Sequence, residues 1–168
     1  MNNLTIFLVF CQSAGAFAGA IAAIWGERAY ILAMRDGKID VAEKAHLRSI
    51  GIGLRFGMTL ILLSSLALVF ISYSLHGTVQ PAMTTSYWIF ITLALLIIII
   101  SSALARHNIP STLGSASAFA AWWLLIYLTL GLLPLSYGAA IALYLVFSGI
   151  MYAVFYYIRL LSLHKRRK

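Results

Sequence analysis

The chain has 168 residues, of which 62% are hydrophobic and only 10% charged, and its formal net charge is +8. Soluble domains carry about a quarter charged residues, and a soluble domain of this length could not bury so much apolar surface. The composition therefore excludes an ordinary soluble enzyme or nucleic-acid-binding domain. Because about 20 apolar residues cross a bilayer, it predicts a single all-α membrane domain over residues 1–168 with five transmembrane helices.

The first two predicted helices are unusually long. The first apolar run predicts a helix over residues 4–34, which Gly37 can end in the left-handed conformation. Asp40 and Glu43 form a variant of the capping box, and the second helix is expected over 40–75. At 1.5 Å per residue both exceed the bilayer thickness. We therefore expect the pair to project into the cytoplasm as a helical hairpin.

Small residues recur at four-residue spacing in both of these helices. Gly15 and Gly19 form a GxxxG motif in the first helix, and Gly53 and Gly57 repeat it in the second. Helices associate in lipid by close backbone approach over small residues. The favoured interpretation is packing inside the bundle, and the alternative is the seam of a homodimer.

Three further helices are predicted over residues 87–104, 116–133 and 138–161. All three prolines fall between predicted spans, where a proline removes no helical hydrogen bond. The spans leave little sequence over, so no soluble domain is expected.

The distribution of basic residues predicts the orientation. The Lys and Arg residues fall in three clusters, after the first, third and last apolar runs, whereas residues 1–3, 75–86 and 133–137 contain none. Short loops rich in Lys and Arg stay cytoplasmic, so the N-terminus is expected outside and the C-terminus inside. The basic tail at 164–168 would then contact anionic lipids. The positive charge is therefore interpreted as a topology signal, and no nucleic-acid partner is expected.

Four ionisable residues lie nearest the hydrocarbon: Glu27, Arg28, Arg55 and Arg106. Charged groups in membranes are costly and tend to be paired or functional. A Glu27–Arg55 ion pair that closes the inner mouth is one interpretation, and the favoured one is that both side chains reach the cytoplasmic headgroups. All the acidic residues of the chain lie on the predicted cytoplasmic side, and they are Glu27, Asp36, Asp40 and Glu43. None is expected at mid-membrane, which argues against a proton relay.

A polar stripe follows the last helix. Six residues fall within about 120° of one another at 100° per residue, and they are Tyr137, Tyr144, Ser148, Tyr152, Tyr156 and Arg159. The favoured interpretation is hydrogen bonding to neighbouring helices, and the alternative is a polar pathway or ligand cleft. In that hypothesis the Tyr137–Tyr144–Tyr152 stripe and the Gln12–Gly19 face of the first helix border a common polar cleft. The candidate ligand-binding residues are Gln12, Glu27, Arg28, Arg55, Tyr137, Tyr144, Ser148 and Tyr152.

The histidines do not form a metal site. His46, His107 and His164 lie on the predicted cytoplasmic side and His76 near the outer face, whereas a membrane haem b normally uses two axial histidines in facing spans. No spacing of histidines or cysteines is typical of a metal site. We therefore expect neither a metal nor a cofactor in the leading interpretation.

Several motifs over residues 5–125 carry a resemblance to a known group. They are Gly15 and Gly19 before a DGKI turn, then Glu43, the pattern GLxxGxxLxxxS over 53–64, Ala105-Arg106-His107 with Pro110, and Ser117 and Trp122. In these features the chain resembles small bacterial membrane proteins related to the copper-resistance CopD and cytochrome-b-like groups. The resemblance implies haem b or copper near His107. Those proteins often carry a histidine in the first helix, and Gln12 stands at the matching position here.

The leading functional expectation is a bacterial inner-membrane protein that handles a small polar or anionic solute, either transport- or channel-like or as an accessory subunit. One alternative is a redox protein with haem or copper near His107, and another is a structural subunit of a membrane complex. A homo-oligomer or a larger complex is possible in each case. No enzyme is expected, because no nucleophile–base pair or carboxylate cluster lies in a plausible cleft.

Overall fold

The computed structural model describes residues 3–36, 41–76, 84–106, 108–131 and 135–164. In chain order, these residues form the helices α1 (Asn3–Asp36), α2 (Val41–His76), α4 (Thr85–Ala105), α5 (Ser111–Thr129) and α6 (Tyr137–His164). Each helix contains a segment that is long and apolar enough to cross a membrane. The described part of the chain is thus all-helical with five candidate spans, as predicted, and is compatible with an integral membrane protein.

The first two helices are continuous over all the described residues of their predicted ranges. α1 has 34 residues and α2 has 36, which corresponds to about 50 Å each. The expected long hairpin is confirmed in this respect. Its turn at Gly37 and the Asp40 cap lie outside the described residues, and its projection into the cytoplasm stays a prediction.

The fourth helix differs from its predicted bounds of 116–133. α5 begins at Ser111, directly after Pro110, whose backbone is at φ −57° and ψ 135°. Proline is tolerated at a helix start because the N–H groups there have no acceptor within the helix, so the missing N–H of proline costs no hydrogen bond. At the other end Gly131 has φ +62°, and this left-handed residue ends the helix after Thr129. Local backbone chemistry therefore shifts the helix toward the N-terminus relative to the apolar run.

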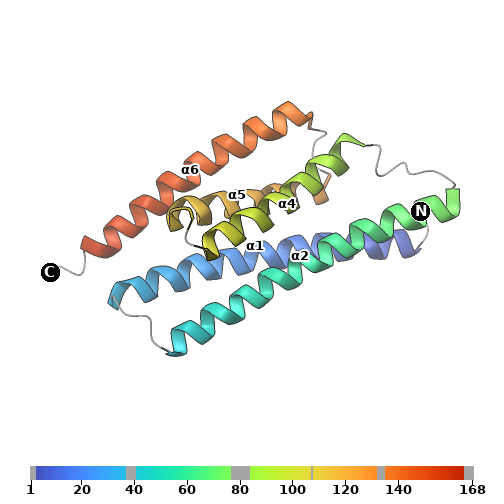
Figure 1. Cartoon of the computed structure of the whole chain (residues 1–168). Coiled ribbons are helices and arrows are strands. Elements are labelled where there is room, and N and C mark those ends of the chain that lie inside the picture. The colour runs from blue at the N-terminus through green and yellow to red at the C-terminus, as the bar shows by residue number, and fades with distance from the viewer. Residues whose placement is uncertain (1–2, 37–40, 77–83, 107, 132–134, 165–168) are drawn as a thin grey trace.

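α5 is the central helix of the bundle. It packs against α1 on one side and against α4 and α6 on the other, whereas α2 packs almost only along α1. Figure 1 shows the α1–α2 hairpin on one side of the molecule and α4, α5 and α6 on the other. α5 also contributes many of the most buried side chains, including Trp122 and Leu125. The core therefore lies around α5.

Two close approaches over glycine join the layers. A Cβ added to Gly57 would lie 2.8 Å from the carbonyl oxygen of Gly15, so the backbones of α1 and α2 touch there. A Cβ on Gly19 would collide with the indole ring of Trp122 from α5. Gly15 and Gly19 of α1 thus allow close packing inside the bundle, which was the favoured interpretation of the GxxxG motif.

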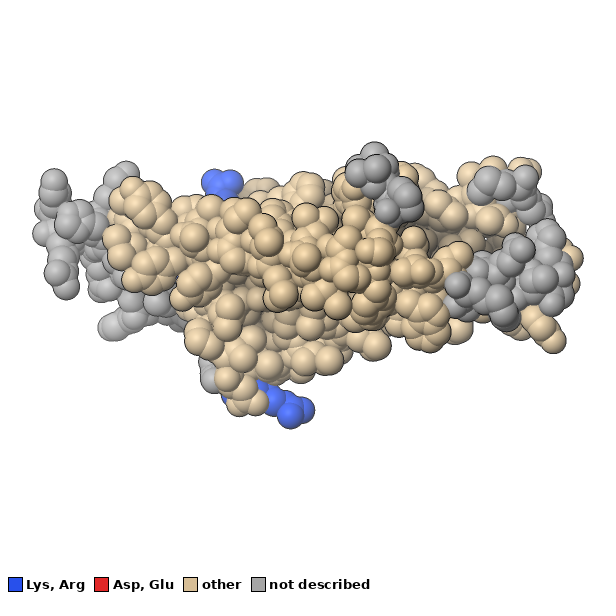
Figure 2. Space-filling model, turned by 90° about the horizontal axis from the view of Figure 1, so that it is seen from above, with Lys and Arg blue, Asp and Glu red and all other residues tan. Residues whose placement is uncertain are grey.

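One end of the bundle gathers the basic side chains. At this end, which we call the basic end, α1, α4 and α6 finish and α2 and α5 begin. Arg28, Arg48 and Arg106 are exposed there. Arg55 is exposed further along α2, between Gly53, which faces Ala22, and Gly57, which faces Gly15. In Figure 2 the visible Lys and Arg atoms lie in the half of the molecule where α6 finishes, and the remaining described surface on that face is tan.

Candidate functional site

A polar cluster joins three helices near the basic end. α1 contributes two of its residues, the first turns of α5 contribute three, and α6 contributes a single arginine. We call it the Arg159 cluster, and its members are Glu27, Tyr30, Ser111, Thr112, Ser115 and Arg159.

A bidentate ion pair forms the centre of this cluster. Arg159 Nε donates to Glu27 Oε1 at 2.9 Å, and Arg159 Nη2 donates to Glu27 Oε2 at 2.9 Å. The side chains of Arg159 and Glu27 are only 16% and 7% exposed. Paired N–H···O bonds between a guanidinium and a carboxylate are among the strongest polar contacts in proteins. The cluster therefore holds two opposite charges in a largely buried position.

Hydroxyl groups accept hydrogen bonds from the remaining N–H groups of the guanidinium. Nη1 of Arg159 donates to the hydroxyls of Ser111 at 3.1 Å and Thr112 at 2.7 Å. Nη2 donates to Ser115 Oγ at 3.1 Å. A guanidinium has five N–H donors, and each of them thus has an acceptor. The guanidinium also lies 4.7 Å from the centre of the Tyr30 ring, and the Tyr30 hydroxyl donates to Ser111 Oγ at 3.2 Å.

The local sequence explains why these groups converge. Ser111 and Ser115 are four residues apart at the start of α5, so they share one helical face. On α6, Arg159 follows the buried Phe155 by one turn, and Phe155 packs edge-on against Phe119 of α5 with ring centres 5.5 Å apart. This aromatic contact places α6 so that Arg159 reaches the first turns of α5.

The two charges depend on each other energetically. Moving an ion out of water is costly, and a buried pair recovers that cost only when its geometry and remaining hydrogen bonds are satisfied. Both conditions hold for Arg159 and Glu27. Removal of one partner from such a pair typically destabilises a protein by about 3–5 kcal/mol.

The structure changes the predicted partner of Glu27. The carboxylate pairs with Arg159 of α6, whereas Arg55 is exposed on α2. The Glu27–Arg55 interpretation is therefore wrong, and Glu27 is buried rather than extended to the headgroups. Arg28 is exposed and lies over the Trp25 ring, 5.4 Å from its centre. The physical reason is rotation of α1, whose Glu27 face packs toward α5 and α6 instead of α2.

The predicted common cleft between the first and last helices is not formed by the described residues. Gln12 Nε2 donates to Ser65 Oγ of α2 at 2.9 Å, and Gly19 faces Trp122 of α5. The Tyr137 hydroxyl shares a 2.6 Å hydrogen bond with Thr92 of α4. Because α5 packs between α1 and α6, the two polar faces point to different neighbours.

The remaining members of the α6 stripe also separate. Tyr144 is half-buried and lines a crevice of about 70 Å³ between α4 and α6. Tyr152 is exposed and stacks on Tyr156 with ring centres 6.3 Å apart. The Ser148 Oγ is buried and has no hydrogen-bond partner among the described residues. Only the part of the stripe that contains Arg159 forms a polar cluster.

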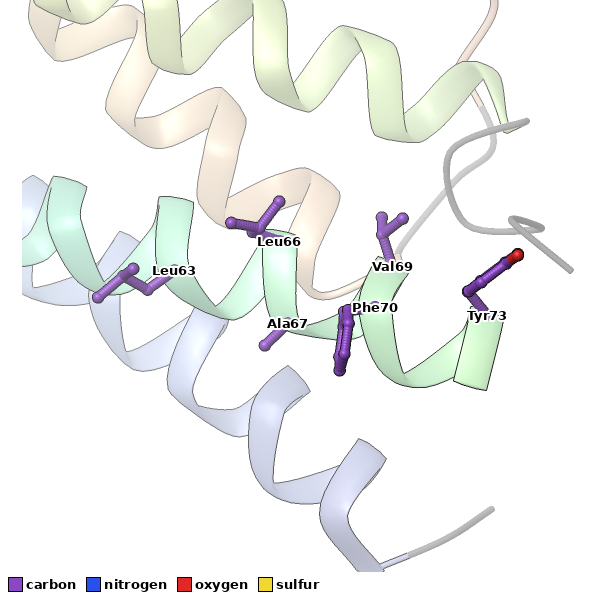
Figure 3. A pocket seen from close by; sticks show the side chains of 6 residues that line it. All are labelled: Leu63, Leu66, Ala67, Val69, Phe70 and Tyr73. Carbon is purple, nitrogen blue, oxygen red and sulfur yellow. The ribbon is translucent and has the colours of Figure 1, made fainter. Parts of the chain in front are cut away.

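A larger groove lies elsewhere, on α2. It has a volume of about 560 Å³ and is lined by Leu63, Leu66, Ala67, Val69, Phe70 and Tyr73. Figure 3 shows these side chains along the half of α2 that is remote from the basic end. Its lining is apolar apart from the Tyr73 hydroxyl, so it suits hydrocarbon and is separate from the Arg159 cluster.

Sequence reasoning found part of the cluster. Glu27 was a candidate and Arg159 belonged to the predicted stripe, but Ser111, Thr112 and Ser115 were missed. The available signal was a run of hydroxyl residues directly after Pro110, at a helix start. No group of three or more His, Cys, Asp or Glu side chains that could hold a metal occurs in the described residues. His107 lies outside those residues, so a haem or copper site beside it stays a prediction.

Comparisons of the chain with models of protein families, with curated proteins and with solved structures find no match. The resemblance to the CopD and cytochrome-b-like groups is therefore tested by none of them and stays a prediction.

Proposed function

We propose that the chain is a non-enzymatic, multi-pass protein of the bacterial inner membrane that handles a small polar or anionic solute in a transport- or channel-like manner. In this proposal the Glu27–Arg159 ion pair is a closed gate at the basic end, and α6 is the element that moves. The observation that carries it is the buried bidentate pair between α1 and α6. Charged groups within membrane spans are costly, and they commonly line solute pathways. The basic end would face the cytoplasm.

The attachment of α6 supports its role as the moving element. α6 packs mainly on α5 and makes few contacts with α1 and α4. Its polar links to those two helices are at its two ends, through Arg159 to Glu27 and through Tyr137 to Thr92. Release of the ion pair would therefore free one end of the helix.

An unpaired hydroxyl on α6 supports a second position of this helix. The Ser148 Oγ is buried without a partner among the described residues, and a buried unpaired polar group costs about 1–3 kcal/mol. A movement of α6 that admits water would give this oxygen a partner. The unpaired hydroxyl of Ser148 thus destabilises the closed arrangement, and the ion pair between Glu27 and Arg159 stabilises it.

The gate can be tested by cysteine accessibility. In a Cys11→Ser background, Ser148→Cys would be labelled with a charged maleimide in lipid nanodiscs, where both membrane faces are accessible. Labelling should be slow while Glu27 is present. Glu27→Gln weakens the pair and should raise the labelling rate roughly tenfold or more, because it increases the open population.

A buried position in the hairpin provides the control. Ala16 of α1 is fully buried, so Ala16→Cys should stay unreactive in the presence and absence of Glu27→Gln. Labelling of both positions would indicate general loosening of the bundle. If Ser148→Cys stays unreactive with Glu27→Gln, the gate proposal is wrong.

A structural or accessory subunit of a membrane complex is the second candidate. The observation that favours it is the filled interior, in which Gly15 meets Gly57 and Gly19 meets Trp122. In that case the Arg159 cluster would be a permanent link that fixes α6 on α1 and α5. Loss of stability with Glu27→Gln, without any exposure of position 148, would support this candidate over the gate.

A further inference from the structure

We infer that the Arg159 cluster is a binding site for an oxyanion, either a carboxylate or a phosphate, which competes with the Glu27 carboxylate for the guanidinium of Arg159. The inference rests on the proposed function, because it names the class of solute that the gate would admit. Glu27 then acts as an internal occupant that an external anion replaces.

The ion pair shows what the site recognises. Glu27 places two oxygens on the Nε and Nη2 groups of Arg159, each at 2.9 Å. The planar guanidinium fork matches the oxygen spacing of carboxylates and phosphates equally well. A ligand with either group could therefore take the position of the Glu27 side chain without rearrangement of Arg159.

The hydroxyl groups would complete the binding of such a ligand. Ser111, Thr112 and Ser115 now accept hydrogen bonds from Arg159 at 2.7–3.1 Å. A hydroxyl also carries a proton that can rotate toward a new acceptor. Phosphate has more acceptor oxygens than the two that Arg159 engages, so these hydroxyls could donate to the others.

The surrounding charge favours an anion over a cation. Arg28 and Arg48 are exposed at the same end of the bundle, and the charge of Glu27 is already balanced by that of Arg159. A surface with several basic groups raises the local concentration of anions. The side chains of the pair keep 16% and 7% of their surface exposed, so the site is recessed without being sealed.

Competition by Glu27 predicts how affinity should respond to substitution. An oxyanion can bind only when Arg159 is not paired with Glu27. Its apparent affinity is therefore reduced in proportion to the fraction of molecules in that unpaired state. Glu27→Gln removes the charge of the internal competitor and keeps its shape. It should therefore raise the affinity for an oxyanion, whereas a purely structural pair predicts no binding in either form.

The experiment measures binding of radiolabelled inorganic phosphate and acetate to the full chain in phosphatidylcholine nanodiscs. We expect Glu27→Gln to bind at least one of them roughly tenfold more tightly than the unmodified chain. The double variant Glu27→Gln/Arg159→Gln should bind neither. Arg106→Gln, which alters one exposed arginine at the same end, should lower the affinities only slightly. Glu27→Asp, which keeps the charge but shortens the side chain, provides a second variant if Glu27→Gln does not fold, and it should also bind more tightly than the unmodified chain.

A second arm separates a free solute from a lipid headgroup. Nanodiscs that contain phosphatidylglycerol should block phosphate binding to Glu27→Gln if the site takes a phosphate from a lipid. If it takes a free solute, phosphatidylglycerol should leave the binding unchanged. Either result supports the oxyanion site and shows whether its ligand comes from a lipid or from solution.

Two outcomes keep this inference distinct from the gate. If Glu27→Gln exposes position 148 but both it and Glu27→Asp bind phosphate and acetate no better than the double variant, the oxyanion class is overturned and the gate stands. If Glu27→Gln binds an oxyanion while position 148 stays unreactive, the gate is wrong and the binding site stands.

Discussion

Among the described glycines, Gly19 has the closest contact to an added Cβ, which is to the ring of Trp122. The indole is fully buried, and a Cβ on Gly19 would collide with it. Gly19→Ala should therefore destabilise the protein by about 1–3 kcal/mol, because a well-packed interior has no room for a methyl group. The measurement is the midpoint of denaturation by sodium dodecyl sulfate in mixed micelles. Gly51 of α2 provides the control, because nothing lies within 4 Å of its added Cβ. Gly51→Ala should leave stability unchanged or raise it. Equal losses of stability with the two substitutions would contradict the prediction.

Arg159 and Glu27 should show strong energetic coupling at the residue scale. Arg159→Gln leaves the Glu27 carboxylate buried without a countercharge, and about 3–5 kcal/mol of stability should be lost. Addition of Glu27→Gln should restore a large part of this loss, since the unpaired charge is then gone. A double-mutant cycle in the same denaturation assay measures this coupling. Arg159→Lys should recover only part of the stability, because an ammonium cannot form the bidentate contact. Additive effects of the two single changes would disprove the coupling.

At the scale of an element, the end of α5 depends on a single backbone conformation. Gly131 has φ +62°, and nothing lies within 4 Å of its added Cβ, so a side chain there meets no steric contact and only conformational strain. Gly131→Ala should cost about 1–2 kcal/mol and Gly131→Asn less, because asparagine visits the left-handed region more readily. Thermal denaturation in detergent would test this order. Gly138, in the first turn of α6, is equally open but has no left-handed conformation, and Gly138→Ala should not destabilise the protein.

At the scale of the whole molecule, the arrangement of the helices gives the predicted topology a direct test. Ser86 near the start of α4 and His46 near the start of α2 are both exposed. The starts of these two helices lie toward opposite ends of the bundle (Figure 1). In a Cys11→Ser background, Ser86→Cys should react with a membrane-impermeant maleimide on intact cells, and His46→Cys should react only after permeabilisation. The reason is the segregation of Lys and Arg. Labelling of position 46 but not 86 in intact cells would reverse the orientation.

Much of the helical organisation was determined by the sequence itself. The long apolar runs predicted five helices near their observed positions, because the length and hydropathy of a span are local properties. The glycine spacing in α1 and α2 predicted close packing inside the bundle, and Gly15 and Gly57 do meet. Even the start of α5 was readable in principle, since Pro110 is a local signal that outweighs the apolar pattern.

The partner of Glu27 was decided only by the tertiary structure. Arg159 lies 132 positions after Glu27 in the chain, whereas the expected partner Arg55 was placed at a similar depth on the neighbouring helix. Depth along a membrane span follows from the sequence, but the rotation of each helix about its axis follows from packing. Trp122 on Gly19 and Phe155 on Phe119 set that rotation. The polar faces of α1 and α6 are therefore divided among three neighbours, and the charges meet across the first turns of α5.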